Sequence, residues 1–448
     1  MRYLPLSTDD RAQMLDTIGV KNINDLFVDV PKHALLDDLV DLPLHMTEME
    51  VERNFAVFAA RNIPAGSVPF FVGAGAYHHH VPSAVDYQIQ RGEFLTAYTP
   101  YQPEISQGTL QTLYEFQTQV AQLTGMDVAN ASMYDGSTAC GEAALMASRV
   151  TKKNKIVISG NLHPQYIEVV KTATKYTDDE IILNDPTVNK KEDLLANVDE
   201  ETSCVIVQYP DFFGNINDYS HLAEKLHEQN ALLVVVTTEV VSLGAIKSPG
   251  EMGADIVVGE GQSIGNGLSF GGPYVGLFAT RQQYVRQLPG RLCGETVDAD
   301  GKRGYVLTLS TREQHIRREK ATSNICTNAG LCTLAFTIHM TLLGEKGLRQ
   351  LAKINHASAV KLAGMLKEVD GLKILNDTFF NEFTVKLNKN AADVVEALVE
   401  QDVIAGLPVS RMYPDRPELA NDLIIAVTET VSEDDMCILV SELKEVLK

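Results

Sequence analysis

The fold of this chain is decided by two runs, Cys204-Val-Ile-Val-Gln208, which is apolar up to its last residue, and Leu232-Leu-Val-Val-Val236, which is apolar throughout. A strand with one solvated face alternates apolar and polar residues, whereas a strand buried on both faces is apolar throughout. Helices are expected between such runs, at 166–174 and 220–229. The repeated order of strand, helix and strand predicts a mostly parallel sheet within an α/β fold.

Further strands of this sheet are expected outside the two deciding runs. They are 155–159, 180–183, 255–258 and 274–279, and a long helix is expected from Gly136 to Arg149. Ligands of open α/β sheets bind at the carboxyl ends of the strands. The loops after Ser159, Gln208, Val236 and Val258 are therefore the first places to look for a site.

The amino-terminal residues have a helical pattern. Ser7 can cap a helix that runs to Thr17, and Thr47 can cap another helix. Leu35, Leu36 and Leu39 recur at helical spacing after Pro31. We therefore predict a helical arm over residues 1–62, followed by the large α/β domain over 63–330.

The carboxyl-terminal residues indicate a smaller α+β domain. A helical stretch over 327–369 precedes strands at 373–375, 383–387 and 423–427, helices at 391–400 and 433–447, and a turn at 406–408. We predict that a linker helix and this small domain occupy residues 331–448.

Composition excludes several classes of protein. The chain has 448 residues and a net charge of −21, which disfavours binding to a phosphate backbone, so we expect no nucleic-acid partner. No apolar run is long enough to span a membrane, and the start lacks the features of a signal or transit peptide. The six cysteines form no CxxC pair. We expect a soluble cytoplasmic protein without a disulfide scaffold.

Two segments after predicted strands suggest a ligand site. The run Tyr134-Asp-Gly-Ser-Thr-Ala-Cys-Gly141 opens a helix, and free amides at a helix start bind anions. Capping by Asp135 or Ser137 is the simpler interpretation of the same residues. His163 follows a strand and could stack on a planar ring, although one histidine there is more often structural.

Three other motifs allow more than one interpretation. The loop Gly259–Gly267 has GxGxxxG spacing rather than the GxGxxG of dinucleotide-binding loops. Consecutive His78, His79 and His80 point in alternate directions and have no companion ligands, so we predict no metal site. The basic residues Arg312, Arg317, Arg318 and Lys320 indicate either a solvated helix face or a site for an anionic ligand or acidic protein.

The segment Tyr98-Thr-Pro-Tyr-Gln-Pro-Glu-Ile-Ser-Gln-Gly108 is a stiff loop with many polar side chains. Proline restricts its backbone, so its tyrosine hydroxyls and amides would be presented with little entropy left to lose. Loops of this kind more often carry function than form plain turns.

These segments together resemble the P-protein of the glycine cleavage system, glycine dehydrogenase (decarboxylating), and most closely the first subunit of its split form. The stretches that carry the resemblance are 97–108, 115–118, 129–136, 210–214, 253–263 and 312–327. The resemblance implies a fold-type-I pyridoxal-phosphate transferase architecture. It also implies that residues 136–139 and His163 stand where such enzymes hold the cofactor's phosphate and ring.

The departures from that family indicate which subunit this is. Where the catalytic subunit has a His-Lys pair, this chain has Gln262 and Ser263, so the Schiff-base lysine is absent. Lys247 is the only rival and lies before the strand. Glu239 is the only candidate for the acid that pairs with the pyridine nitrogen. We therefore expect pyridoxal phosphate to be bound covalently by a partner subunit and not by this chain.

The resemblance implies a role in glycine catabolism. With a lysine-bearing subunit 2, as a heterotetramer, the chain would decarboxylate glycine and transfer the aminomethyl group to the lipoyl arm of the H-protein. We expect Tyr98, Tyr101 and Gln102 to reach the partner's cofactor. Two alternatives stay open: a non-catalytic structural or regulatory subunit of the same complex, and a nucleotide-binding oxidoreductase that uses the Gly259–Gly267 loop.

Overall fold

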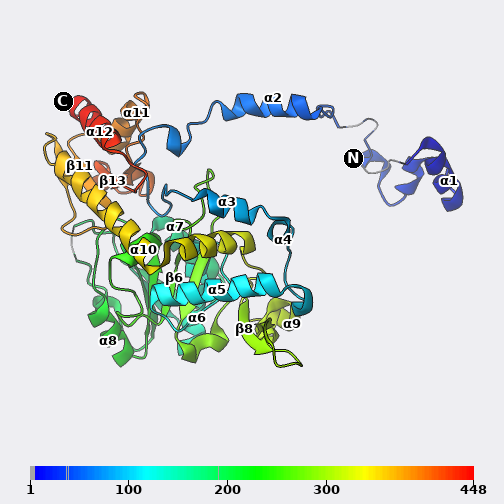
Figure 1. Ribbon diagram of the computed structural model, residues 1–448, viewed down its shortest axis with the longest axis horizontal. Coiled ribbons are helices and arrows are strands. Elements are labelled where there is room, and N and C mark those ends of the chain that lie inside the picture. Colours follow the sequence, from blue (N-terminus) through cyan, green and yellow to red (C-terminus); the bar gives the residue numbers. More distant parts are fainter. Residues whose placement is uncertain (1–5, 37, 39, 190) are drawn as a thin grey trace. The chain divides into compact units, whose positions relative to one another are not determined.

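A computed structural model describes residues 6–36, 38, 40–189 and 191–448 (Figure 1). The chain divides into two compact units, Met1–Ile63 and Pro64–Lys448. The further division near residue 330 stays a prediction.

The first unit contains the two capped helices that the sequence predicts, α1 (Thr8–Ile18) and α2 (Glu48–Ala59). Asp10 N–H donates to Ser7 Oγ at 3.1 Å, and Thr47 N–H donates to Glu50 Oε2 at 2.7 Å. The predicted helix near Leu35 is wrong: the described residues form only a 3-10 turn, Lys32–Ala34, and Leu39 lies outside them. Helix nucleation is unfavourable in so short a segment unless tertiary packing stabilises the helix, and Leu36 is exposed and does not provide such packing.

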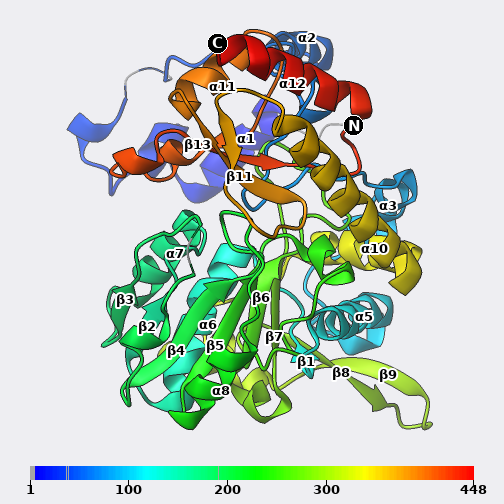
Figure 2. The ribbon, with the colours of Figure 1, turned by 90° about the vertical axis from the view of Figure 1, so that its left-hand side faces the viewer.

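The second unit is built on a seven-stranded sheet of order β1-β7-β6-β5-β4-β2-β3 (Figure 2). Its strands are β1 (Val128–Ala129), β2 (Lys155–Ile158), β3 (Glu180–Leu183), β4 (Thr202–Gln208), β5 (Leu232–Thr237), β6 (Ile256–Glu260) and β7 (Gly276–Thr280). Strands β2 to β6 pair in parallel, as predicted. Strand β7, expected at 274–279, pairs antiparallel with β6, because a loop and not a crossover helix joins them.

The deciding runs do not alternate apolar and polar residues because the sheet separates two cores. Val205 and Val207 face a core that includes α5 (Gln107–Thr124) and α8 (Ser220–Glu228). Cys204 and Ile206 face the opposite core, which includes α6 (Gly136–Thr151) and α7 (Pro164–Thr174). Both faces of the sheet are therefore covered, as the sequence pattern requires.

The carboxyl-terminal part follows the long helix α10 (Gly330–Leu366), which Figure 2 shows running from the large sheet to the small one. The helix is kinked at Gly344, where φ is 56°. The small antiparallel sheet contains β10 (Leu372–Ile374), β11 (Glu382–Leu387), β13 (Asp422–Ala426) and β12 (Leu407–Pro408), with helices α11 (Ala391–Val399) and α12 (Glu433–Val446). The turn expected at 406–408 is thus an edge strand, a position where proline is tolerated.

Several elements have no counterpart in the sequence analysis. They include β1, α5, the hairpin β8 (Leu292–Val297) and β9 (Arg303–Thr308), and the short helices α3 (Ser83–Ile89) and α4 (Gly92–Leu95), whereas α9 (Gln314–Arg317) is a single turn within the basic segment. The hairpin turn contains Asp300-Gly301, with Gly301 at φ 77°, which is a recognisable turn signal. None of the helices in the described residues is long and apolar enough to cross a membrane.

Candidate functional site

The start of α6 is capped by its own chain. Thr138 N–H donates to the Asp135 side chain at 2.9 Å, as the capping interpretation predicts. Gly136 N–H donates to Oε2 of Glu260, at the end of β6, also at 2.9 Å. A side chain at Gly136 would meet the Tyr166 hydroxyl at 2.3 Å. A carboxyl group of the protein therefore occupies the anion position at this helix start.

Glu260 is held firmly there. Its Oε1 accepts from the backbone N–H of Gln262 at 3.1 Å and of Val275 at 3.0 Å. Burial raises the pKa of Glu260 to about 8, although the backbone N–H groups oppose the shift.

The loop after β6 is closed by Tyr77. Gln262 Oε1 accepts from Tyr77 N–H at 2.8 Å, and Gln262 Nε2 donates to Tyr77 O at 2.9 Å. Ser263 is buried, and its Oγ has no hydrogen-bond partner in the described part of the chain. Lys247 is exposed and donates to Ser220 Oγ at 3.0 Å, at the start of α8. The sequence has no lysine between Lys247 and Lys302, so the loop itself contains none.

Both ring nitrogens of His163 form hydrogen bonds with the backbone. Its Nδ1 accepts from Gln165 N–H at 3.2 Å, which caps α7, and its Nε2 lies 2.9 Å from Ala74 O. A side chain at Gly75 would lie 3.2 Å from the ring. Burial lowers the pKa of His163 to about 4, so the ring is neutral. These contacts agree with the structural interpretation.

Glu239 is also engaged, in a buried ion-pair cluster with His79 and Glu429. The two imidazole nitrogens of His79 lie 2.8 Å from Glu239 Oε2 and 2.8 Å from Glu429 Oε2. Burial opposes the charge of His79, but the attraction and hydrogen bonds of the two carboxylates raise its pKa to about 10. No group of metal-ligating residues that could hold an ion is found within the described ranges.

Little space remains between these groups. Glu382 Oε1 accepts from Ala74 N–H at 2.5 Å and its Oε2 accepts from the Tyr77 hydroxyl at 2.8 Å. Burial raises the pKa of Glu382 to about 7. The cavity beside Glu239 and Glu382 measures about 10 Å³, which is roughly enough for one water molecule.

The Gly259–Gly267 loop has a packing role. A side chain at Gly259 would lie 2.1 Å from Thr237 O, and one at Gly265 would lie 2.3 Å from Ala335 O. No helix begins in this loop, which runs from β6 to β7. Close backbone packing therefore explains these glycines, and the nucleotide-binding interpretation is not favoured.

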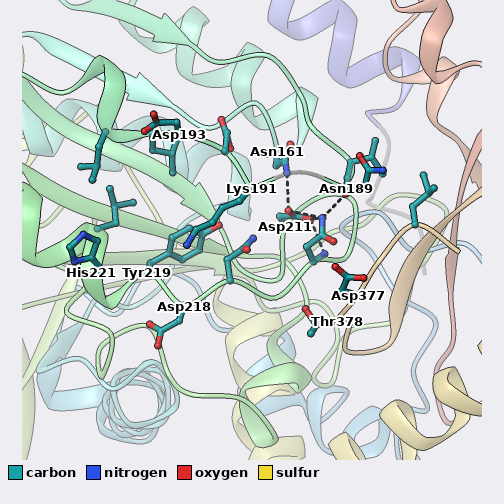
Figure 3. Close-up of a pocket in the computed structure, with 18 residues that line it drawn as sticks. Asn161, Asn189, Lys191, Asp193, Asp211, Asp218, Tyr219, His221, Asp377 and Thr378 are labelled. Atoms are coloured by element: carbon teal, nitrogen blue, oxygen red, sulfur yellow. Dashed lines mark hydrogen bonds between the residues drawn. The ribbon is translucent and has the colours of Figure 1, made fainter.

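A larger cavity of about 520 Å³ lies beside the loops after β2 and β4 (Figure 3). Asp211, at its inner wall, accepts from Asn161 Nδ2 at 2.9 Å and from Asn215 N–H at 2.9 Å. Burial raises the pKa of Asp211 to about 6. Asp377 and Thr378 close the cavity from the carboxyl-terminal part. Asp211 thus ties together two of the four loops singled out from the sequence.

The predicted site loop lies between α4 and α5, and its two tyrosines and Gln102 are exposed, whereas Pro100 is buried. Tyr98 is 89% exposed and Tyr101 is 58% exposed, and Gln102 is exposed as well. Tyr98 lines a cavity of about 340 Å³ together with Thr327 and Asn328. The tyrosines therefore do not pack beneath the loop.

The basic residues near this loop divide into two groups. Arg312 is partly buried and donates to Gly290 O at 2.8 Å and to Leu288 O. Arg317, Arg318 and Lys320 are exposed, in short helical turns rather than one helix. Arg312 is thus structural, whereas the other three are free to meet solvent or a partner.

Comparison with known proteins identifies the family. The family model described as "Glycine cleavage system P-protein" matches residues 1–443. The chain belongs to this P-protein family. It is 64% identical to a probable glycine dehydrogenase (decarboxylating) subunit 1 of Parvibaculum lavamentivorans, over all of both chains. A relative of the same name from Erythrobacter litoralis is 63% identical over all of both chains.

Solved structures agree with the P-protein assignment. A crystal structure of glycine decarboxylase (P-protein) in inhibitor-bound form shares 42% identity and a TM-score of 0.91, with all of both chains covered. Glutamate decarboxylase of Lactobacillus brevis, at 15% identity, has a TM-score of 0.67 over 91% of this chain and 94% of that one. That likeness shows the fold alone, which is the predicted fold of type-I pyridoxal-phosphate enzymes.

The P-protein fold implies pyridoxal phosphate, but the residues of this chain do not fit it. Glu260 accepts from the Gly136 N–H at the helix start, Glu239 is paired with His79, and Tyr77 is hydrogen-bonded to Gln262 in the loop after β6. Contacts within the chain therefore engage Gly136, His163 and Glu239.

Sequence reasoning missed the residues that fill this place. Glu260 and Glu382 are charged residues beside apolar ones, whereas His79 is the middle one of three consecutive histidines. A charged residue in an apolar segment signals a buried group that needs a partner. The partner itself does not follow from the sequence.

Proposed function

We propose that this chain is the subunit without a Schiff-base lysine in a two-chain glycine dehydrogenase (decarboxylating). The hydrogen bond from Gly136 to Glu260 carries the proposal, because it puts the chain's own carboxyl group where a cofactor phosphate would bind. Pyridoxal phosphate then belongs, covalently, to the lysine-bearing subunit 2. The names of the full-length relatives support this role.

The complete enzyme decarboxylates glycine and passes the aminomethyl group to the lipoyl arm of the H-protein. The partner's cofactor supplies the electron sink for that reaction. This chain presents Tyr98, Tyr101 and Gln102 to the partner's site. The reaction takes place in the cytoplasm, for which the lack of a membrane-spanning helix in the described residues offers support.

The amino-terminal unit supports assembly with the partner in a heterotetramer. Neither α1 nor α2 buries a residue. Apolar side chains of α2, including Val51, Phe55 and Phe58, are exposed. Obligate interfaces bury such apolar surface. We therefore expect this unit to pack on subunit 2.

The test of the loop is Tyr98→Phe and Tyr101→Phe in the assembled complex, followed by glycine–bicarbonate carbon exchange with H-protein present. Losing one hydrogen bond in a closed site costs about 1–3 kcal/mol, or roughly a five- to hundred-fold loss of rate. Tyr176→Phe is the matched control, since Tyr176 is 90% exposed and lies between α7 and β3. Full activity and cofactor affinity in both loop variants would favour a purely structural subunit.

A further inference from the structure

Arg291 is a buried cation without an anion. The residue is 3% exposed, and no ion pair joins it to a carboxylate in the part of the chain that the structure describes. Its Nη1 donates to Thr327 Oγ1 and Asn328 Oδ1, both at 3.1 Å, and its Nη2 donates to Cys326 O at 2.9 Å. Its Nε has no partner. The guanidinium therefore holds one short turn through three acceptors.

The same guanidinium also supports the predicted site loop. Its Cζ lies 5.6 Å from the centre of the Tyr101 ring, a distance at which a cation is attracted to an aromatic face. Tyr101 is more than half exposed, and its other ring contact is with His315, whose ring centre lies 6.3 Å away. The guanidinium is thus one of two groups that order the ring, and the one that is buried. Arg291 thus links two segments that both border the cavity lined by Tyr98, Thr327 and Asn328.

Burying a guanidinium without an ion pair is costly, and an apolar side chain would fill the same space at a lower cost. Only a planar fork of donors reaches several acceptors and a ring face at once. We propose that Arg291 is a positioning residue that holds the Tyr98–Gln102 loop and the Cys326–Asn328 turn in one arrangement for the partner's active site. This inference rests on the proposed function.

The first test measures the order of the loop in the full chain, without activity. The sequence contains no tryptophan, so Tyr101→Trp introduces a single indole at the loop. Adding Arg291→Gln should lower the anisotropy of that indole and shift its emission to the red, as the ring loses its support. Adding Arg291→Lys, which keeps the charge but not the fork, should give an intermediate value and also serves if Arg291→Gln fails to fold.

Arg281→Gln is the matched control. Arg281 likewise has three acceptors, which in its case are all backbone carbonyls: Ala254 at 2.9 Å, Gly250 at 2.6 Å and Gly125 at 3.4 Å. These acceptors lie before β6 and after α5, and none belongs to the two loops. Arg281→Gln should therefore leave the indole signal unchanged even where it lowers thermal stability.

The second test is activity of the assembled complex with Tyr101 intact. Misplacing a site loop by about 1 Å costs up to a hundred-fold in rate, so Arg291→Gln should lower kcat/KM about ten- to hundred-fold and Arg281→Gln less than two-fold. Unchanged anisotropy in the Arg291 variants would overturn the proposal, and so would a loosened loop with unchanged kcat/KM. An inactive complex of the two unaltered subunits would instead refute the proposed function.

Discussion

Replacing His79 by glutamine tests the buried ion-pair cluster. The substitution leaves Glu239 and Glu429 near each other with no cation between them. The pKa of His79 rises from 6.5 to about 10 in the folded chain, and about 1.4 kcal/mol per pKa unit gives an upper limit of roughly 5 kcal/mol. Breaking a buried pair by removing one partner costs about 3–5 kcal/mol, so the two values agree.

The assay is the midpoint of thermal unfolding. Pro64–Lys448 contains roughly 385 residues, and an unfolding entropy of about 2.1 cal/mol/K per residue gives about 0.8 kcal/mol/K. His79→Gln should therefore lower the midpoint by roughly 4–6 °C. The control is His227→Gln, since His227 lies 2.9 Å from Asp255 but is half exposed, and such pairs contribute about 0–1 kcal/mol.

The stability that the ion-pair cluster contributes should depend on pH in a defined direction. The folded pKa of His79 is raised, so its contribution is complete below pH 6.5 and is lost as pH rises through about 10. Glu429 has its pKa lowered to about 2, so its contribution is complete above pH 4.5 and is lost toward pH 2. The difference between wild type and His79→Gln should be largest between those limits, near pH 5–6. A shift no larger than that of His227→Gln, or one that grows above pH 10, would refute the reasoning.

Three further predictions concern the filled site and the amino-terminal unit. The folded pKa of Glu260 is raised to about 8, so its contribution to stability is complete below pH 4.5 and is lost as pH rises through 8. Glu260→Gln should therefore reduce the fall of the melting temperature between pH 6 and pH 8. An equally steep fall in the variant would contradict this. Ser263→Lys alone should give no borohydride-reducible adduct with pyridoxal phosphate, because the chain's own groups fill the space; stoichiometric labelling of any single lysine, Lys247 included, would show otherwise. Deleting residues 1–63 should weaken or abolish the complex with subunit 2, as measured by size-exclusion chromatography, and equal affinity would argue against the packing role.

The sheet could be predicted from sequence because its signal is local. Runs such as Leu232–Val236 owe their composition to burial on both faces, which periodicity reports directly. The capped helices α1 and α2 likewise follow from neighbouring residues. The direction of β7 did not follow, because it depends on how a loop crosses the sheet end.

The contents of the site depend on residues far apart in the chain. Glu260 meets Gly136 across 124 positions, and His79 meets Glu239 and Glu429 across 160 and 350 positions. Local patterns identify Gly136 as a helix start and His79 as one of three histidines, but they do not say what each will contact. The resemblance to a family revealed that the Schiff-base lysine is absent. The groups that fill its place became evident only from the fold.

The exposed apolar side chains of the amino-terminal unit bear on how a cell keeps the two subunits in balance. An unassembled copy carries helices that bury no residue, and such segments are preferred substrates for proteases and chaperones. In the proposed complex, a copy docked on its partner would hide the same segment. Surplus chains would thus be degraded first, and the ratio of the two subunits would be corrected after translation without any dedicated regulator.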